Sequence, residues 1–435
     1  MIKKTACTRA CDSRFGAKAP QKALRVVLVS FLALALLPAS SCAQLESFIS
    51  LDWLYELFFI ERKVEEPPKE IEFSKAVELP ADMLVRSSTG SELLGIRQDA
   101  QTLCLYNIQT KELEEIYESS SDFFIKTIVS NARWVVWVEM DAEIDNAGTL
   151  ARKWQIVALD LAERTNSVID EGEFSGDYEG YGFFPLAPVS LSISDKNTFV
   201  YCKNFANGER IGSQLVYCEL KSGIKRVLQE SADIREDYLS DCTIYNDTVV
   251  WSRFYQTNLD DMRIWTDFRM TTHKYSDVFV YDCISEKVEQ LTRDDFFFAP
   301  EIYGNYLVMV YVPLTKPGQV TTNTEIVFVD LKDKSRSIIV DENSECYEGL
   351  ESASRGLNRY DPSINASCVF WRDPVTRGQY LYDYHSKVFI ELPEEAGLNL
   401  AYSSMIAELF DEAIIVYQGN ENSLGNLRQY YLAFL

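Results

Sequence analysis

Apolar and polar positions along the chain alternate in short runs without helical periodicity. In Ser276–Val312, "SDVFVYDCISEKVEQLTRDDFFFAPEIYGNYLVMVYV", three apolar runs are separated by two short polar turns. Runs of this length, bounded by polar turns, are typical of β-strands. Similar stretches recur along most of the chain, so the pattern indicates an all-β protein built from repeats.

Two signatures mark each repeat. The first is an apolar strand that ends in Trp or Tyr, at Trp137, Tyr201, Trp251, Tyr311, Trp371 and Tyr417. The second is an apolar strand that runs into an acidic or amide residue and a turn, at Asn107, Asp160, Glu219, Asp282, Asp330 and Asp383. Self-similarity at this spacing, with several short strands per unit, predicts a β-propeller.

The repeats divide into seven units, at 82–118, 121–170, 185–230, 238–293, 298–341, 360–393 and 402–435. The last unit stops after three strands, whereas Glu70–Leu79 is a spare strand upstream of the first. We therefore expect one domain, 70–435, with seven four-stranded blades and a ring closed by the N-terminal strand. Six or eight blades remain alternatives at this stage. Closure leaves only short, protected sheet edges.

The amino-acid sequences of the repeats resemble those of a known family. "APEIYGNYLVMVY", "VYDCISEKVEQLT" and "CVFWRDPVTRGQYLYDY" are similar to the TolB-like propeller repeats of bacterial envelope and surface proteins. The resemblance covers most of 82–435 and implies the fold. It implies little about activity, because this architecture carries enzymes, receptors and scaffolds.

The N-terminal segment carries the features of an export signal. A basic stretch precedes the apolar run Val26–Leu37, which is too short to span a membrane. Small residues then precede Cys42, as in the lipobox of bacterial lipoproteins, and that resemblance implies lipid attachment at Cys42. We expect a signal peptide at 1–41 and a tether at 42–69, which includes an apolar segment and a polar linker. Ordinary cleavage nearby and an uncleaved anchor are the alternatives.

These features predict an extracytoplasmic protein of the cell envelope, held on a bacterial membrane by lipid. The net charge is −24, which argues against nucleic-acid binding because that needs a basic surface. Export permits disulfides. Cys202 and Cys218 flank one loop and form a candidate disulfide, while the other cysteines within strands are expected to be buried as small apolar residues.

The expected propeller has two unlike ends. One end carries tight turns, and the other carries long connections, including 140–153, 170–185, 254–274 and 341–358. Loops on a rigid scaffold are where binding groups concentrate. The candidate partner-binding residues on these loops are Tyr178, Tyr181, Phe183, Tyr255, Trp265, Phe268 and Tyr347.

Sequence motifs for catalysis are missing. No GxSxG, P-loop or dinucleotide-binding pattern occurs, and the chain has two histidines. We assign no catalytic residue, metal or cofactor from the sequence. The leading hypothesis is a non-catalytic lipoprotein that binds an envelope protein or a glycan through the long-loop end. The alternative is a hydrolase that acts on a sugar or peptide with carboxylates in the central funnel.

Overall fold

The computed structural model describes residues 74, 76–89, 92–97, 100–120, 122–145, 148–173, 188–257, 273–293, 295–316, 319–320, 324–341, 344, 360–373, 378–390, 407–418 and 428–434. All of them belong to a unit that spans Pro68–Leu435. The predicted signal peptide at 1–41 and the tether at 42–69 lie outside the described residues. Strands are the only regular elements in the described ranges, which contain no helix that could cross a membrane.

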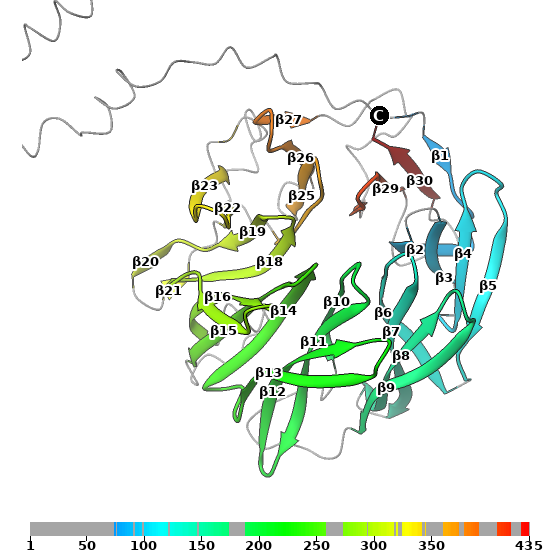
Figure 1. The fold of residues 1–435 in the computed structure, drawn as a ribbon, viewed down its shortest axis with the longest axis horizontal. Coiled ribbons are helices and arrows are strands. Elements are labelled where there is room, and N and C mark those ends of the chain that lie inside the picture. Colours follow the sequence, from blue (N-terminus) through cyan, green and yellow to red (C-terminus); the bar gives the residue numbers. More distant parts are fainter. Residues whose placement is uncertain are drawn as a thin grey trace, which may run out of the picture. The chain divides into compact units, whose positions relative to one another are not determined.

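Seven antiparallel sheets of four strands surround a central axis (Figure 1), which confirms the predicted all-β propeller. Blade 1 contains β2 (Met83–Ser88), β3 (Glu92–Arg97), β4 (Thr102–Asn107) and β5 (Leu113–Glu118). Blade 2 contains β6 (Phe123–Ser130), β7 (Trp134–Asp145), β8 (Gly148–Asp160) and β9 (Thr165–Glu173). Blade 3 contains β10 (Pro188–Ile193), β11 (Thr198–Asn207), β12 (Arg210–Glu219) and β13 (Ile224–Ser231).

Blade 4 contains β14 (Asp237–Tyr245), β15 (Thr248–Thr257), β16 (His273–Asp282) and β17 (Lys287–Gln290). Blade 5 contains β18 (Phe297–Tyr303), β19 (Tyr306–Tyr311), β22 (Glu325–Asp330) and β23 (Ser335–Val340), with a small hairpin of β20 (Leu314–Lys316) and β21 (Gln319–Val320) between β19 and β22. Blade 6 contains β24 (Tyr360–Ile364), β25 (Cys368–Asp373), β26 (Gly378–Asp383) and β27 (Val388–Ile390).

The seventh blade draws its strands from both ends of the described chain. Its order is β1 (Val77–Glu78), β30 (Arg428–Ala433), β29 (Ala413–Gln418) and β28 (Ala407–Leu409). Val77 pairs with Tyr431, and the Leu79 amide donates to the Gln429 carbonyl at 2.8 Å. The predicted closure by an N-terminal strand is therefore confirmed.

The aromatic residue of the first repeat signature lies within the second strand of its blade, and in blades 2, 3, 4 and 6 the strand continues beyond it instead of ending there as expected. The Trp137, Trp251, Trp371 and Tyr201 side chains are all fully buried. Trp137 packs with blade 1, Tyr201 with blade 2 and Trp251 with blade 3, so each of these three contacts the preceding blade. A ring of this size buries a large apolar area. The repeated aromatic is thus part of the packing between successive blades.

The second signature forms the tight turn between the third and fourth strands. The Asp383 carboxylate accepts hydrogen bonds from the His385 and Ser386 amides at 2.8 and 3.1 Å. Four residues after the acid, Lys387 has a φ of 61°, and its amide donates to the Asp383 carbonyl. The same turn recurs at Asn107 and Asp160. An acidic or amide side chain suits this position because it caps the turn locally.

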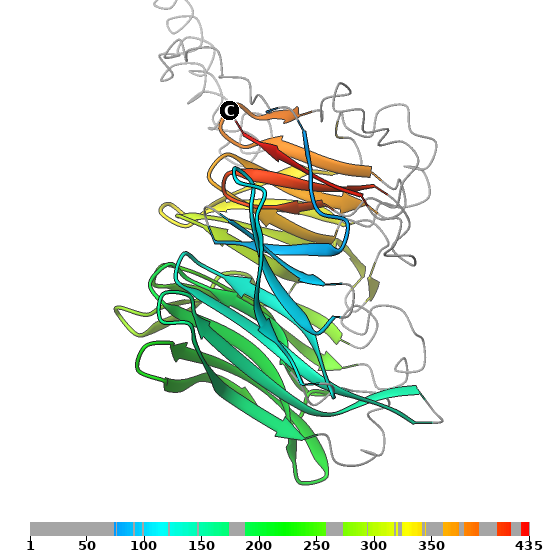
Figure 2. The ribbon, with the colours of Figure 1, turned by 90° about the vertical axis from the view of Figure 1, so that its right-hand side faces the viewer.

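The two ends of the ring differ as expected, with one correction. Tight turns join the first to the second strand and the third to the fourth at one end (Figure 2). The segment 140–153, however, was expected to be an open loop, and residues 140–145 and 148–153 are instead the paired ends of β7 and β8, with Asp145 opposite Gly148. These strand ends project beyond the neighbouring strands (Figure 2).

The candidate disulfide between Cys202 and Cys218 is wrong. Both thiols are free and buried. Across β11 and β12, Cys202 lies opposite Leu215, and Cys218 lies opposite Phe199. Leu215, which lies opposite Cys202, is three residues from Cys218 along β12. Successive side chains on a strand alternate between the two faces, so an odd separation places Cys202 and Cys218 on opposite faces of the sheet. Cys218 accordingly packs toward blade 2 and Cys202 toward blade 4.

Candidate functional site

The predicted partner-binding residues are only partly visible. Tyr255 lies on β15, whereas Tyr178, Tyr181, Phe183, Trp265, Phe268, Tyr347 and the predicted lipid-attachment residue Cys42 lie outside the described residues. The Tyr255 hydroxyl donates to the buried Asp277 carboxylate, and its ring stacks on Tyr275 with 5.7 Å between centroids. Tyr255 is therefore held within its own blade. The long-loop binding face stays a prediction.

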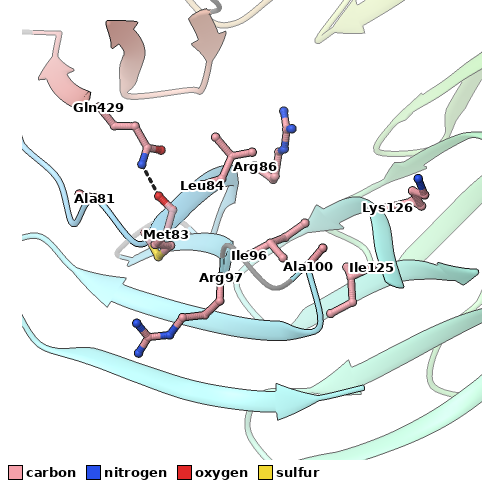
Figure 3. Close-up of a pocket in the computed structure, with 10 residues that line it drawn as sticks. All are labelled: Ala81, Met83, Leu84, Arg86, Ile96, Arg97, Ala100, Ile125, Lys126 and Gln429. Carbon is pink, nitrogen blue, oxygen red and sulfur yellow. Dashed lines mark hydrogen bonds between the residues drawn. The ribbon is translucent and has the colours of Figure 1, made fainter. Parts of the chain in front are cut away.

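One cavity of about 200 Å³ lies beside the ring closure, between blades 7, 1 and 2 (Figure 3). Gln429 lines it, but the side-chain amide of Gln429 donates to the Met83 carbonyl and accepts from the Val85 amide at 2.9 Å. Arg97 points along the wall, where its guanidinium pairs with Asp82 and, at 2.8 Å, with Glu115. This cavity is smaller than typical ligand pockets, and the polar side chains of Gln429 and Arg97 are already bonded to other protein groups. We assign it a structural role.

A larger recess, about 400 Å³, lies where the turns between first and second strands meet. Because the first strands border the axis (Figure 1), these turns surround the central opening at the tight-turn end. The lining comes from blades 1, 2, 3, 6 and 7, namely Ser87, Ser88, Thr89, Ser130, Asn131, Ala132, Asp195, Ile364, Asn365, Leu409, Phe410, Asp411 and Glu412. The volume is in the range of small-molecule sites.

Hydrogen bonds between neighbouring blades make the rim of this recess rigid. The Asn131 side chain caps its own turn and donates to the Ser194 carbonyl of the next blade at 2.8 Å. Asn365 does the same toward the Phe410 carbonyl, also at 2.8 Å. Ser194 continues the series by donating to the Asn246 carbonyl at 3.0 Å. Groups on such a rim are held in place by backbone contacts, as a binding or catalytic site requires.

Three exposed carboxylates face this recess: Asp195 in the turn of blade 3, and Asp411 and Glu412 in the turn of blade 7. Although the Asp411 side chain reaches solvent, the protein atoms around the recess partly desolvate its carboxyl group, and this desolvation, reinforced by the Asp195 charge, raises the pKa of Asp411. Partial desolvation and the Asp411 charge likewise raise the pKa of Glu412.

Nearby basic side chains do not neutralise these carboxylates. Arg133 pairs with Asp160 at 2.6 Å, and Lys196 pairs with Asp247. Within the described part of the chain, no lysine or arginine forms an ion pair with Asp195, Asp411 or Glu412. The recess therefore concentrates negative charge.

Blades 4 and 5 add two tyrosines next to the carboxylates. Tyr245 and Tyr303, at the ends of β14 and β18, contact each other with 4.7 Å between ring centroids. Burial, the Asp411 charge and the Tyr245 neighbour raise the pKa of Tyr303 to about 12. Tyr303 is thus a neutral hydrogen-bond donor at neutral pH, next to Asp411.

Sequence reasoning missed the individual members of this site. It placed carboxylates in the central funnel as the alternative, without assigning residues. Asp195 lies in "SDKN" and Asp411 in "FDEA", and both are ordinary polar turns of a chain with 66 acidic residues. No His, Cys, Asp and Glu group among the described residues is arranged to hold a metal ion.

Comparisons with known proteins identify the architecture. No protein-family model and no curated protein matches the chain. The β-propeller domain of the Trilobed protease from Pyrococcus furiosus is 12% identical over 82% of this chain and 95% of that chain, with a TM-score of 0.51. A structure from a study of two prolyl endopeptidases is 9% identical over 81% of this chain, with a TM-score of 0.52, and the match spans 50% of its own length.

An oligogalacturonate lyase from Vibrio parahaemolyticus is 12% identical over 84% of this chain and 96% of that chain, with a TM-score of 0.45. At these identities, the protease and endopeptidase matches establish the propeller fold and nothing narrower. The TolB-like resemblance stays a prediction.

Proposed function

We propose that the protein is a hydrolase that cleaves a glycan in the central recess. Asp411 is the proton donor in this proposal, and Asp195 is the second carboxylate. The observation that carries it is the set of three carboxylates around a recess of about 400 Å³ that form no ion pair with any described lysine or arginine, two of them with raised pKa values. Glycoside hydrolysis uses a pair of carboxyl groups, one of which has a raised pKa and acts as the acid.

The surrounding groups suit this chemistry. An acid with a raised pKa keeps its proton to a higher pH than an ordinary carboxylic acid and can give it to the leaving oxygen. The second carboxylate either attacks the sugar or activates water. The likeness of fold to a protease domain and an endopeptidase is consistent with an enzyme.

The test is a hydrolysis screen of the full chain against soluble glycans, with a peptide panel run in parallel. We expect Asp411→Asn to lower the turnover of a glycan at least about 100-fold, because the proton donor is lost. The wild-type rate should fall as the pH rises through the pKa of Asp411. Glu118→Gln, which changes an exposed carboxylate on blade 1, is the matched control and should keep full activity.

Unchanged turnover in both Asp411→Asn and Asp195→Asn would overturn the assignment of the recess. Cleavage of peptides instead of glycans, still dependent on Asp411, would keep the site and change the substrate. Circular dichroism of each variant would separate a lost proton donor from a lost fold.

A second candidate function is a non-catalytic, lipid-anchored receptor or scaffold of the cell envelope. The difference between the two ends of the ring favours it, since the longer connections gather opposite the tight turns. Crosslinking mass spectrometry on producing cells would compare the wild type with Cys42→Ser. Partners that are crosslinked through residues 170–185, 254–274 or 341–358, and lost in Cys42→Ser, would support this function; an unchanged crosslink pattern would rule out the anchor.

A further inference from the structure

The core between blades 3 and 4 holds two thiols in contact. Cys202 lies on β11, the second strand of blade 3, and Cys242 lies on β14, the first strand of blade 4. Their exposures are 0% and 1%, and both belong to one apolar cluster that also contains Trp251. Burial first, and then the Cys242 side chain, raise the pKa of the Cys202 thiol, so the two side chains are close enough to interact across the seam between the two blades.

Ser190 adjoins both cysteines. It lies directly opposite Cys202 in the pairing of β10 with β11. Its hydroxyl lies 3.3 Å from the Cys242 sulfur and accepts a hydrogen bond from the Cys242 amide at 3.2 Å. Ser190 on β10, Cys202 on β11 and Cys242 on β14 are thus positioned by the backbones of three strands. Their approach does not depend on a mobile loop.

We propose that Cys202 and Cys242 form a disulfide that joins blades 3 and 4 when the chain folds in the presence of an oxidant. A disulfide needs Cα atoms within roughly 4.4–6.8 Å and side chains directed at each other, and a contact between side chains on facing strands fits this requirement. Cys202 and Cys218 point to opposite faces of their sheet, and the face that carries Cys202 packs against blade 4.

The oxidant is itself a disulfide, such as oxidised glutathione or the active-site disulfide of a thiol oxidase. The thiolate of one cysteine attacks the oxidant and displaces one of its thiols, and the second cysteine then displaces the other thiol. One S–S bond forms and one breaks, so two protein thiols are oxidised and two oxidant thiols are released. Burial, and then the Cys242 contact, raise the pKa of the Cys202 thiol, so this exchange belongs to the folding chain and not to the closed core.

The bond would cross-link neighbouring blades, which otherwise associate only through non-covalent packing. It would also close a loop of about 40 residues in the unfolded chain, and such a loop restricts the unfolded state. For a domain of this size we expect the thermal midpoint to rise by roughly 5 °C.

The test is refolding of the full chain from denaturant, with glutathione redox buffer in one sample and reductant in the other. Free thiols are then blocked with N-ethylmaleimide under denaturing conditions, and the unreduced peptides are mapped by mass spectrometry. We expect a cross-linked peptide pair that contains Cys202 and Cys242, and an oxidised midpoint about 5 °C above the reduced one. In Cys242→Ala the difference should vanish. In the control Cys368→Ala, which changes another fully buried thiol, it should persist.

Two outcomes would overturn the proposal: N-ethylmaleimide on both Cys202 and Cys242 after oxidative refolding, or a cross-link from either of them to another cysteine. If Cys242→Ala does not fold, the wild-type peptide map decides the question alone.

Discussion

Asp170 shows how a single carboxylate can join two blades. It lies on β9, at the outer edge of blade 2, and its side chain is 11% exposed. Lys203 of blade 3 contacts one carboxylate oxygen at 2.6 Å, and Lys225 contacts the other at 3.2 Å. The Tyr201 hydroxyl also donates to it at 2.8 Å. Burial alone would raise the pKa of Asp170, but these hydrogen bonds and the Lys203 charge outweigh burial and lower that pKa.

Asp170→Asn should lower the free energy of unfolding by roughly 2 kcal/mol at pH 7, because two lysines lose a charged partner that is mostly buried. A lowered pKa in the folded state stabilises the protein above the unfolded pKa of about 4, and this contribution is lost as the pH falls through the folded pKa. The deficit of the variant should therefore shrink in acid.

Urea unfolding at pH 7 and near pH 3 would measure both effects. Glu118→Gln, an exposed carboxylate on an outer strand, is the control and should change stability little at either pH. A deficit for Asp170→Asn that is equal at both pH values would contradict the ion-pair explanation.

At the scale of an element, the short strand β1 depends on one side chain for its junction with blade 1. Gln429 on β30 is 1% exposed. Its amide donates to the carbonyl of Met83 and, at 3.3 Å, to that of Pro80, and its oxygen accepts from the Val85 amide. β1 itself is short, with Val77 and Glu78 paired to Tyr431 and Tyr430. Gln429 thus ties the last blade to the first where β1 leads into β2.

Gln429→Ala should reduce the free energy of unfolding by roughly 2–3 kcal/mol, because a buried amide and a buried carbonyl lose their partners. Chemical denaturation would measure this change, with the exposed Gln109→Ala as the matched control. Equal stability of the two variants would show that water or a small shift replaces the Gln429 contacts.

For the whole molecule, the blades and their closure could be predicted because each repeat is local. Each blade contains an apolar strand with an aromatic residue and a capped turn, and both can be recognised within a short stretch of sequence. The blade boundaries can therefore be predicted to within a few residues. The partner of Cys202 could not be predicted in this way. Cys242 belongs to the next blade, and the strand register that directs Cys202 away from Cys218 is not readable from spacing alone.

The residues of the recess could not be predicted for the same reason, because they lie even further apart in the sequence. Asp195 and Asp411 occupy turns of blades 3 and 7, which come together only when seven blades surround one axis. Acidic residues are common in turns of this chain, so neither position differs from a solvated turn in the sequence. The expectation of an open loop at 140–153 was wrong because β7 and β8 continue pairing through 140–145 and 148–153.

The pairing of β1 with β30 also has a consequence during synthesis. Val77 leaves the ribosome long before Tyr431, its partner in the sheet. A product that stops before β30 already contains blades 1 to 6 in full, yet it leaves the last blade unfinished and the ring open, with unpaired backbone for proteases and chaperones to recognise. Only a product that includes β30 conceals these edges. The closure therefore lets quality control distinguish a prematurely ended chain from a finished propeller.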